Sequence, residues 1–272
     1  MKTKAFRLSR VSFPKAIRWL GFLSVAVASF TFPSDLGAAV VISYQGPDNP
    51  ALGVWTRSSL SINNSVEAIP SEGAWQTKDN SDVPTSGGVF YSANAADYAS
   101  DAAQGWRLSA RVSLIDASAA SVAMLAYTDN EGRSYYLSFD AHRVTGNTRV
   151  LALNALTGSY RYFDTGTSGY IDYHMVYDGN PDKTVSVYIG DSAIPVIQDY
   201  AGFDNQSNWS NTVQWGTNRG EGTAILHWKS VEFAVIPEAD TALLTFIGSG
   251  ILAYCFMRQR RRSARIPAGQ EL

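Results

Sequence analysis

Between residues 40 and 236, apolar side chains recur at every second position of several segments. In Trp106–Leu114 five apolar residues alternate with polar ones, and Ser134–Phe139 repeats the alternation. A period of two places neighbouring side chains on opposite faces of an extended strand. No stretch shows the 3.6-residue apolar stripe of an amphipathic helix. The pattern therefore predicts β-strands that bury one face.

Turn-forming residues separate these segments. Asp178–Asp182 interrupts Tyr173–Gly190 and predicts two strands joined by a turn, and Thr128–Arg133 reads as a hairpin turn. Ser59–Ser86 is rich in Ser, Asn and Pro and is expected to be a loop. Further strands are expected at Val40–Gly46, Gly87–Ala93, Asn211–Gly216 and Ala224–Val235. Frequent short strands with such turns predict an all-β fold, an antiparallel two-sheet jelly-roll sandwich over residues 40–236.

The C-terminal region has a different pattern. Thr241–Met257 is an apolar run of 17 residues without an ionised side chain, the short limit for a helix that crosses a ~30 Å hydrocarbon layer. An arginine cluster follows at once, and such a cluster holds its end on the cytoplasmic side. A single transmembrane helix is the prediction, with a buried core helix as the alternative. The cluster consists of Arg258, Arg260, Arg261 and Arg262.

The N-terminus has the order of a secretory signal. Six basic residues precede the apolar stretch Trp19–Phe32, and the small residues of Leu36–Ala39 follow it. We therefore expect a signal peptide at residues 1–39, with an uncleaved anchor as the alternative. The predicted organisation is then residues 1–39, an exported domain 40–236, an anchor region 237–263 and a cytoplasmic tail 264–272.

The anchor region resembles the PEP-CTERM sorting signal of Gram-negative bacteria. Pro237, Glu238 and Ala239 precede the apolar run and the arginine cluster, although proline is usual at the third motif position. The resemblance implies a partner, an exosortase-like membrane protease, that processes the protein at the inner membrane and leaves it at the cell surface or in the extracellular matrix. A plain C-terminal anchor without processing is the alternative.

Charge and cysteine content limit the partners and the catalytic groups that can be expected. Residues 40–236 hold 11 of the 22 basic and 20 of the 24 acidic residues, a net charge of −9. An acidic surface repels nucleic acid, so nucleic acid is not an expected partner. The single cysteine, Cys255, lies in the apolar run, so the exported domain has neither a disulfide nor a catalytic thiol.

The exported domain resembles the concanavalin A-like lectin/glucanase jelly roll in its laminin-G-like form. The resemblance rests on Gly105–Leu114, Ala126–Phe139, Tyr173–Asp191 and Val213–Phe233. Hydrolases of this fold use two carboxylates on alternate positions of one strand. The acidic residues here are scattered, and the histidines are too far apart to suggest a triad or a zinc site. No catalytic residue is therefore expected. The acidic and histidine residues in question are Glu67, Glu72, Glu131, Glu221, Glu232, His142, His174 and His227.

A possible binding site lies in the polar segment Asp204–Asn211. Trp209 stands there among amides, with Asn208 and Asn211 beside it, and sugars bind by stacking on an aromatic ring with amide hydrogen bonds at its rim. The alternative is that Trp209 packs onto the sandwich. Asp199, Asp204 and Asn205 could hold calcium, but their spacing does not establish a metal site, so no cofactor is expected.

These features together predict an exported bacterial surface or matrix protein that is not an enzyme. Adhesion or binding to extracellular polysaccharide is the expected role. A glycan-processing enzyme and a structural surface protein without a ligand remain as alternatives.

Overall fold

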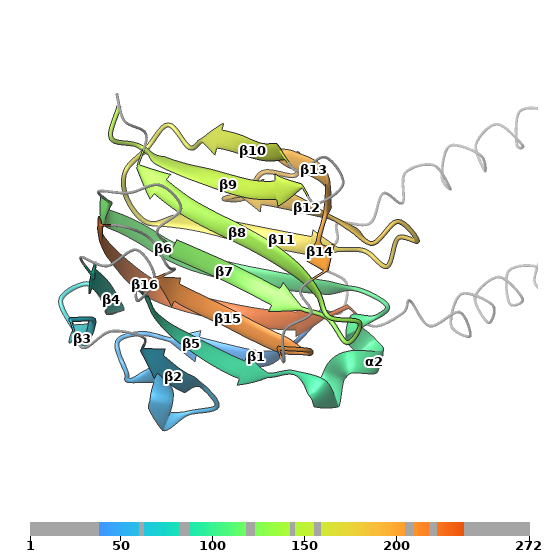
Figure 1. The fold of residues 1–272 in the computed structure, drawn as a ribbon, viewed down its shortest axis with the longest axis horizontal. Helices are drawn as coiled ribbons and strands as arrows, with labels where there is room; N and C mark the ends of the chain where they lie inside the picture. The colour runs from blue at the N-terminus through green and yellow to red at the C-terminus, as the bar shows by residue number, and fades with distance from the viewer. Residues whose placement is uncertain are drawn as a thin grey trace, which may run out of the picture. The chain divides into compact units, whose positions relative to one another are not determined.

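The computed structural model describes residues 38–59, 63–81, 88–117, 123–141, 145–154, 159–204, 209–217 and 222–236. Two sheets of antiparallel strands face each other across one core (Figure 1). The prediction of an all-β domain with two antiparallel sheets is therefore confirmed.

The first sheet has the spatial order β13-β12-β11-β6-β16-β4-β3, and β1 also pairs with β16. Residues 222–228 of β16 pair with β4, and residues 230–235 of the same edge pair with β1. One edge of the long strand β16 thus pairs with two different strands, β4 along its first half and β1 along its second half. The strands are β1 (Ala39–Gln45), β3 (Ser65–Ile69), β4 (Ala74–Ser81), β6 (Trp106–Ala117), β11 (Ile171–Tyr177), β12 (Thr184–Ile189), β13 (Ile197–Ala201) and β16 (Gly222–Val235).

The second sheet has the order β10-β9-β8-β7-β15-β5-β2, and the short β14 pairs with β8. Its strands are β2 (Thr56–Ser59), β5 (Val89–Asn94), β7 (Ala123–Thr128), β8 (Arg133–Ala141), β9 (Thr148–Asn154), β10 (Ser159–Asp164), β14 (Phe203–Asp204) and β15 (Thr212–Thr217). Helical turns are confined to η1 (Pro50–Leu52), η2 (Ala96–Tyr98) and α2 (Ala99–Ala102) in the described part of the chain.

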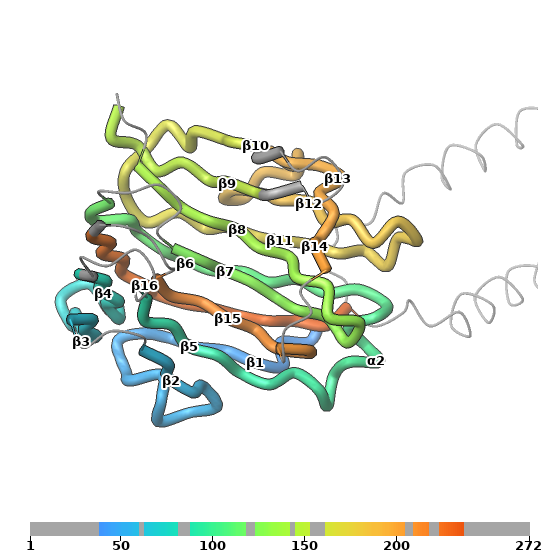
Figure 2. Tube along the Cα trace, in the orientation of Figure 1, coloured from blue at the N-terminus to red at the C-terminus, as the bar shows by residue number. Residues whose placement is uncertain are grey.

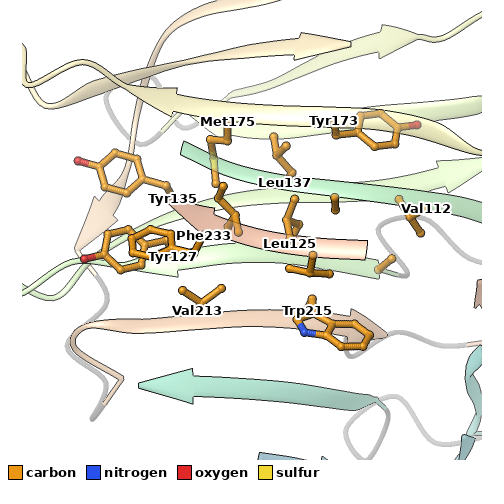
Figure 3. Packing of buried hydrophobic residues seen from close by; sticks show 14 of the residues in the cluster. Val112, Leu125, Tyr127, Tyr135, Leu137, Tyr173, Met175, Val213, Trp215 and Phe233 are labelled. Carbon is orange, nitrogen blue, oxygen red and sulfur yellow. The ribbon is translucent and has the colours of Figure 1, made fainter. Parts of the chain in front are cut away.

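The core between the sheets is rich in aromatic rings. Trp215 of β15 is fully buried, and Tyr44 and Tyr91 stack on it with ring centroids 5.0 and 4.7 Å away. Trp228 of β16 lies 5.1 Å from Trp215 and donates its indole N–H to Thr77 at 2.9 Å. Figure 3 shows Trp215 in this layer with residues from both sheets. Because each buried ring removes a large apolar area from water, truncating one to alanine costs about 3–5 kcal/mol.

The strand predictions hold where the alternation is strong and fail in one segment. β6, β8, β11, β12, β15 and β16 lie where they were predicted, and Trp106 is in the core at 1% exposure. The expected loop Ser59–Ser86 is wrong, because it contains the hairpin of β3 and β4. Trp75 and Thr77 of β4 are buried, and apart from Ala74 the remaining side chains of this strand are polar. This half-polar strand lacks the continuous apolar signal of a central strand.

The two ends of the described domain lie side by side. Ala39 of β1 pairs with Val235 of β16, so the chain enters and leaves the sandwich at one point (Figure 2). No helix among the described residues is long and apolar enough to span a membrane. The predicted transmembrane helix Thr241–Met257, the arginine cluster, the motif Pro237–Ala239 and residues 1–37 of the predicted signal peptide lie outside the described residues.

Candidate functional site

The outward side of the second sheet, called here the outer face, carries a continuous row of side chains across six strands. The row alternates with core residues such as Leu125 and Trp215, so it points away from the sandwich. A second, parallel row crosses four strands. The first row is Phe90, Gly216, Met124, Ser138, Leu151 and Tyr162; the second is Ser92, Gln214, Ala126 and Tyr136.

The middle of the outer face is made of small residues, with aromatic rings to either side. Gly216, Ala126 and Ser138 are buried although they point out of the sandwich. Phe90 lies towards one edge of the sheet, and Tyr162, with 53% of its surface exposed, lies at the other. The face thus combines a centre of small, buried residues with aromatic rings at its sides.

Glycine at position 216 is a steric requirement. Its φ of +141° is rarely adopted by other residues, and a Cβ there would lie 2.4 Å from the carbonyl oxygen of Val89 and 2.7 Å from the Cα of Phe90. Thr217 fixes the same strand pair, because its hydroxyl accepts from the Val89 N–H at 2.7 Å and donates to the Val89 carbonyl at 3.1 Å. These contacts place Phe90 against β15.

Trp209 lies over the outer face. Its ring is half-buried and meets Phe90 edge-on, with centroids 6.0 Å apart and an interplanar angle of 73°. Asn211 fixes the segment that carries Trp209: its N–H donates to the Asp129 carbonyl, and its own carbonyl accepts from the Ala95 N–H. Its φ of +53° is a conformation that asparagine tolerates well, and its Oδ1 is buried without a hydrogen-bond partner among the described residues. Asn208, the third predicted binding residue, lies outside the described residues.

A charge pair stabilises the opposite side of the outer face. Arg149 of β9 donates from Nε to Asp140 Oδ1 at 2.8 Å and from Nη2 to Asp140 Oδ2 at 2.5 Å. The Asp140 side chain is only 2% exposed, and the hydrogen bonds to it raise the pKa of Arg149. The guanidinium also lies 4.7 Å from the centre of the Tyr162 ring. The sequence did not identify four residues of this face: Asp140, Arg149, Tyr162 and Phe90. For Asp140 the alternation in β8 would have placed the side chain on the outward side of the strand.

A retaining or inverting glycosidase needs two carboxyl groups that flank one bond. In the described strands of the second sheet, the carboxylates are Asp140 of β8, Asp164 of β10 and Asp204 of β14, and both oxygens of Asp140 bind Arg149. Glu67 and Glu232 belong to the first sheet, and Glu131 lies in the β7–β8 turn, as expected from their scatter. Glu221 lies outside the described residues.

The two described histidines make structural contacts on the first sheet. His227 is buried, with Nδ1 2.8 Å from Glu72 Oε2 and Nε2 3.0 Å from Gln76 Oε1. Tyr170 donates to the same Glu72 oxygen at 2.5 Å, and these hydrogen bonds from Tyr170 and His227 lower the pKa of Glu72. His174 lies 2.9 Å from the Ser109 hydroxyl. His142 lies outside the described residues.

The structure describes two of the three residues considered for calcium. Asp199 and Asp204 are exposed on β13 and β14, and Asn205 lies outside the described residues. Among the described residues there is no group of three or more His, Cys, Asp or Glu side chains placed to hold a metal ion.

No protein-family model and no curated protein matches the sequence. The fold is similar to that of a carbohydrate esterase from the Shiga toxin-encoding bacteriophage phi24B, with a TM-score of 0.50 and 15% identity over 73% of this chain and 99% of that chain. A β-1,3-glucanase from Mycobacterium marinum aligns with a TM-score of 0.40 and 12% identity over 72% of this chain and 99% of that chain. The binding domain of a botulinum neurotoxin DC aligns with a TM-score of 0.44 and 12% identity over 78% of this chain and 51% of that chain. The likeness to the phage esterase shows a shared fold and nothing about activity.

Proposed function

We propose that this protein binds carbohydrate at the outer face of the second sheet and does not hydrolyse it, on a jelly-roll sandwich of the concanavalin A-like type. The observation that carries the proposal is Trp209, a half-buried ring held edge-on to Phe90 over this face. A partly exposed ring held by a second ring is suited to stack on the apolar face of a sugar. Gln214 on the same face is partly exposed and carries an amide group of the kind that binds sugar hydroxyls.

The charge distribution favours a neutral or basic glycan. The exported domain has a net charge of −9, which repels polyanions. On the outer face itself, the charge of Arg149 is matched by Asp140. A neutral polysaccharide avoids the cost of desolvating an unmatched charge on binding.

The test is glycan binding by the Trp209→Ala variant of the full chain. Loss of the stacking surface should weaken binding by about 1–3 kcal/mol, roughly ten- to a hundredfold or more. The matched control is Tyr188→Ala, which removes a half-buried ring from β12 on the opposite sheet and should leave binding unchanged. Both variants should melt within a few degrees of the wild type. A blank glycan array with the wild-type chain would support the structural, ligand-free alternative instead.

A turnover assay separates binding from catalysis. The pairing of Asp140 with Arg149 supports a non-enzymatic role, because a carboxylate engaged by a bidentate arginine is a poor general acid. The full chain should therefore release no reducing sugar or acyl group from any polysaccharide that it binds. Release that Trp209→Ala abolishes would assign the outer face to an enzyme.

We also propose that the tail carries the sorting signal. The support is the sequence order of Pro237–Ala239, the apolar run and the arginine cluster, together with the resemblance to exosortase substrates. Deleting Thr241–Arg262 should move the protein to the soluble exported fraction, as judged by cell fractionation. If mass spectrometry of protein from an exosortase-bearing host always finds Gln270–Leu272, the protein is a plain anchored protein.

A further inference from the structure

A small cavity lies at one end of the sandwich, beside the β7–β8 turn. It has a volume of about 80 Å³, comparable to about three water molecules. Alanine side chains of α2 and the following residue form one wall, and the rim comes from the β7–β8 turn and Lys183. Four aromatic residues form the rest of the lining: Trp106, Tyr127, Tyr135 and Tyr177.

The aromatic wall is a single packed cluster. Trp106 meets Tyr127 and Tyr135 with ring centroids 5.0 and 5.3 Å apart, and Tyr177 is 6.2 Å away. All four residues are at most 7% exposed. Figure 3 shows that the hydroxyls of Tyr127 and Tyr135 point to the same side, whereas the hydroxyl of Tyr173 points the opposite way. The wall of the cavity is thus formed by packed side chains of the hydrophobic core.

Tyr127 leaves a polar atom without a partner in this cavity. Its side chain is 1% exposed, and its hydroxyl forms no hydrogen bond with the described residues. The neighbouring hydroxyls are engaged, because Tyr135 donates to the Lys183 carbonyl at 3.1 Å and Tyr177 donates to the Asn180 carbonyl at 3.2 Å. An occupant of the cavity can form a hydrogen bond with this hydroxyl.

Asp129 brings a carboxylate without an ion pair to the same cavity. Its Oδ1 accepts the N–H groups of Glu131 and Arg133 at 2.9 and 2.8 Å, which forms the β7–β8 turn. Among the described residues no basic side chain forms a salt bridge with it, because Lys183 pairs with Glu131. Burial raises the pKa of Asp129, and the negative charge of Glu131 also raises it. The hydrogen bonds of the turn and the charge of Arg133 lower this pKa, but the raising effects are larger. The other carboxylate oxygen, Oδ2, forms no salt bridge with a described residue.

The groups of the cavity therefore match a positively charged donor. The hydroxyls of Tyr135 and Tyr177 already donate to backbone carbonyls, so they can only accept a further hydrogen bond. Asp129 Oδ2 is also a hydrogen-bond acceptor. We propose that this end cavity binds a small organic ammonium group, with Asp129 as its ion partner, Tyr127 as its second acceptor and the aromatic cluster as its wall. Cations are attracted to such rings, and the attraction grows when both are shielded from water. An amino sugar, a polyamine or an exposed lysine of another protein would supply this group.

The test is calorimetric titration of the full chain with methylammonium chloride at constant ionic strength. Ethanol and acetate serve as the neutral and anionic probes. Methylammonium should bind saturably and raise the melting temperature, as expected for a ligand of the folded state, whereas ethanol and acetate should do neither. An equal response to ethanol would make the cavity a neutral hydroxyl site and overturn the proposal, and so would the absence of saturable methylammonium binding.

Two variants assign the binding to the cavity. Asp129→Asn keeps the Oδ1 acceptor that forms the turn but removes the charge, and it should weaken methylammonium binding at least about tenfold. Tyr127→Phe removes only the hydroxyl and should weaken it about three- to tenfold. The matched controls are Asp178→Asn and Tyr173→Phe. Asp178 is a turn aspartate of the β11–β12 hairpin outside this cavity, and the buried hydroxyl of Tyr173 has no hydrogen-bond partner in the part of the chain that the structure describes.

Each outcome of the variant series is decisive. If both controls bind as the wild type and both cavity variants are weakened, the site is the end cavity. If Asp129→Asn binds methylammonium as tightly as the wild type, the proposal fails. Melting curves of all four variants distinguish lost binding from lost folding, because the two conservative cavity changes should melt within a few degrees of the wild type.

Discussion

Breaking the Asp140–Arg149 pair should be among the most destabilising polar changes on the outer face. Arg149→Met keeps the aliphatic stem and removes the guanidinium, which leaves the 2% exposed Asp140 side chain without its ion partner. Removing one member of a buried ion pair costs about 3–5 kcal/mol. Because the Arg149 side chain is 25% exposed, water reaches the site, and the lower end, about 3 kcal/mol, is expected.

A double-mutant cycle isolates the interaction. Asp140→Asn keeps an oxygen acceptor but loses the charge, and it should cost about 1–2 kcal/mol because charge-assisted hydrogen bonds are stronger than neutral ones. In the double variant Arg149→Met/Asp140→Asn no buried charge remains unpaired. The double variant should therefore be more stable than Arg149→Met alone, with a coupling energy of about 2 kcal/mol.

The assay is urea unfolding of the full chain, followed by tryptophan fluorescence at pH 7. The matched control is Arg111→Met, which breaks an exposed pair with Asp172 whose side chains are 47% and 39% exposed. Exposed pairs contribute little, so this change should cost below about 1 kcal/mol. If Arg149→Met costs no more than Arg111→Met, or if the coupling energy is near zero, the reasoning about the buried carboxylate is refuted.

Two further predictions concern the backbone and the pH dependence. Gly216→Ala should destabilise the fold by about 3–5 kcal/mol in urea unfolding, because a φ of +141° is strained for alanine and the new Cβ would meet backbone atoms of β5. The control is Gly166→Ala, which has a positive φ but no atom within 4 Å of the new Cβ, and it should cost about 1–2 kcal/mol. Equal losses of stability in the two variants would contradict the steric argument. The lowered pKa of Glu72 means that the bonds from Tyr170 and His227 stabilise the fold above the ordinary value of 4.5, and that this contribution is lost as pH falls through the lowered value. Glu72→Gln should therefore lower the melting temperature at pH 7 more than at pH 3, and an equal shift at both values would contradict the linkage.

The strands with strong alternation could be predicted from the sequence. In β6 the residues Trp106, Leu108 and Ala110 repeat at a period of two, and a one-residue slip would expose all of them. β7 could not be recognised in this way, because all six of its residues are buried and its outward Met124 and Ala126 look like core residues. Periodicity fails where both faces of a strand are covered.

The candidate site was also predictable only in part from the sequence. Local sequence identified Trp209 because one aromatic residue stands among polar ones in a loop, but it gave no information on whether the ring would join the core. The pairing of β15 with β5 decided this by placing Phe90 under the ring. Arg149 and Asp140, nine residues apart, become partners only through the register of β8 and β9.

What the sequence determined by itself is the class of chain: an all-β domain with two antiparallel sheets, an acidic surface charge and no cysteine between residues 40 and 236. These properties depend on composition and on a period that neighbouring residues set. Only the tertiary structure decided that Asp129, Tyr127 and α2 share a cavity, and that outward residues of six strands form one face. Such groupings depend on contacts between strands far apart in the chain, where register, rather than residue type, decides which side chains meet.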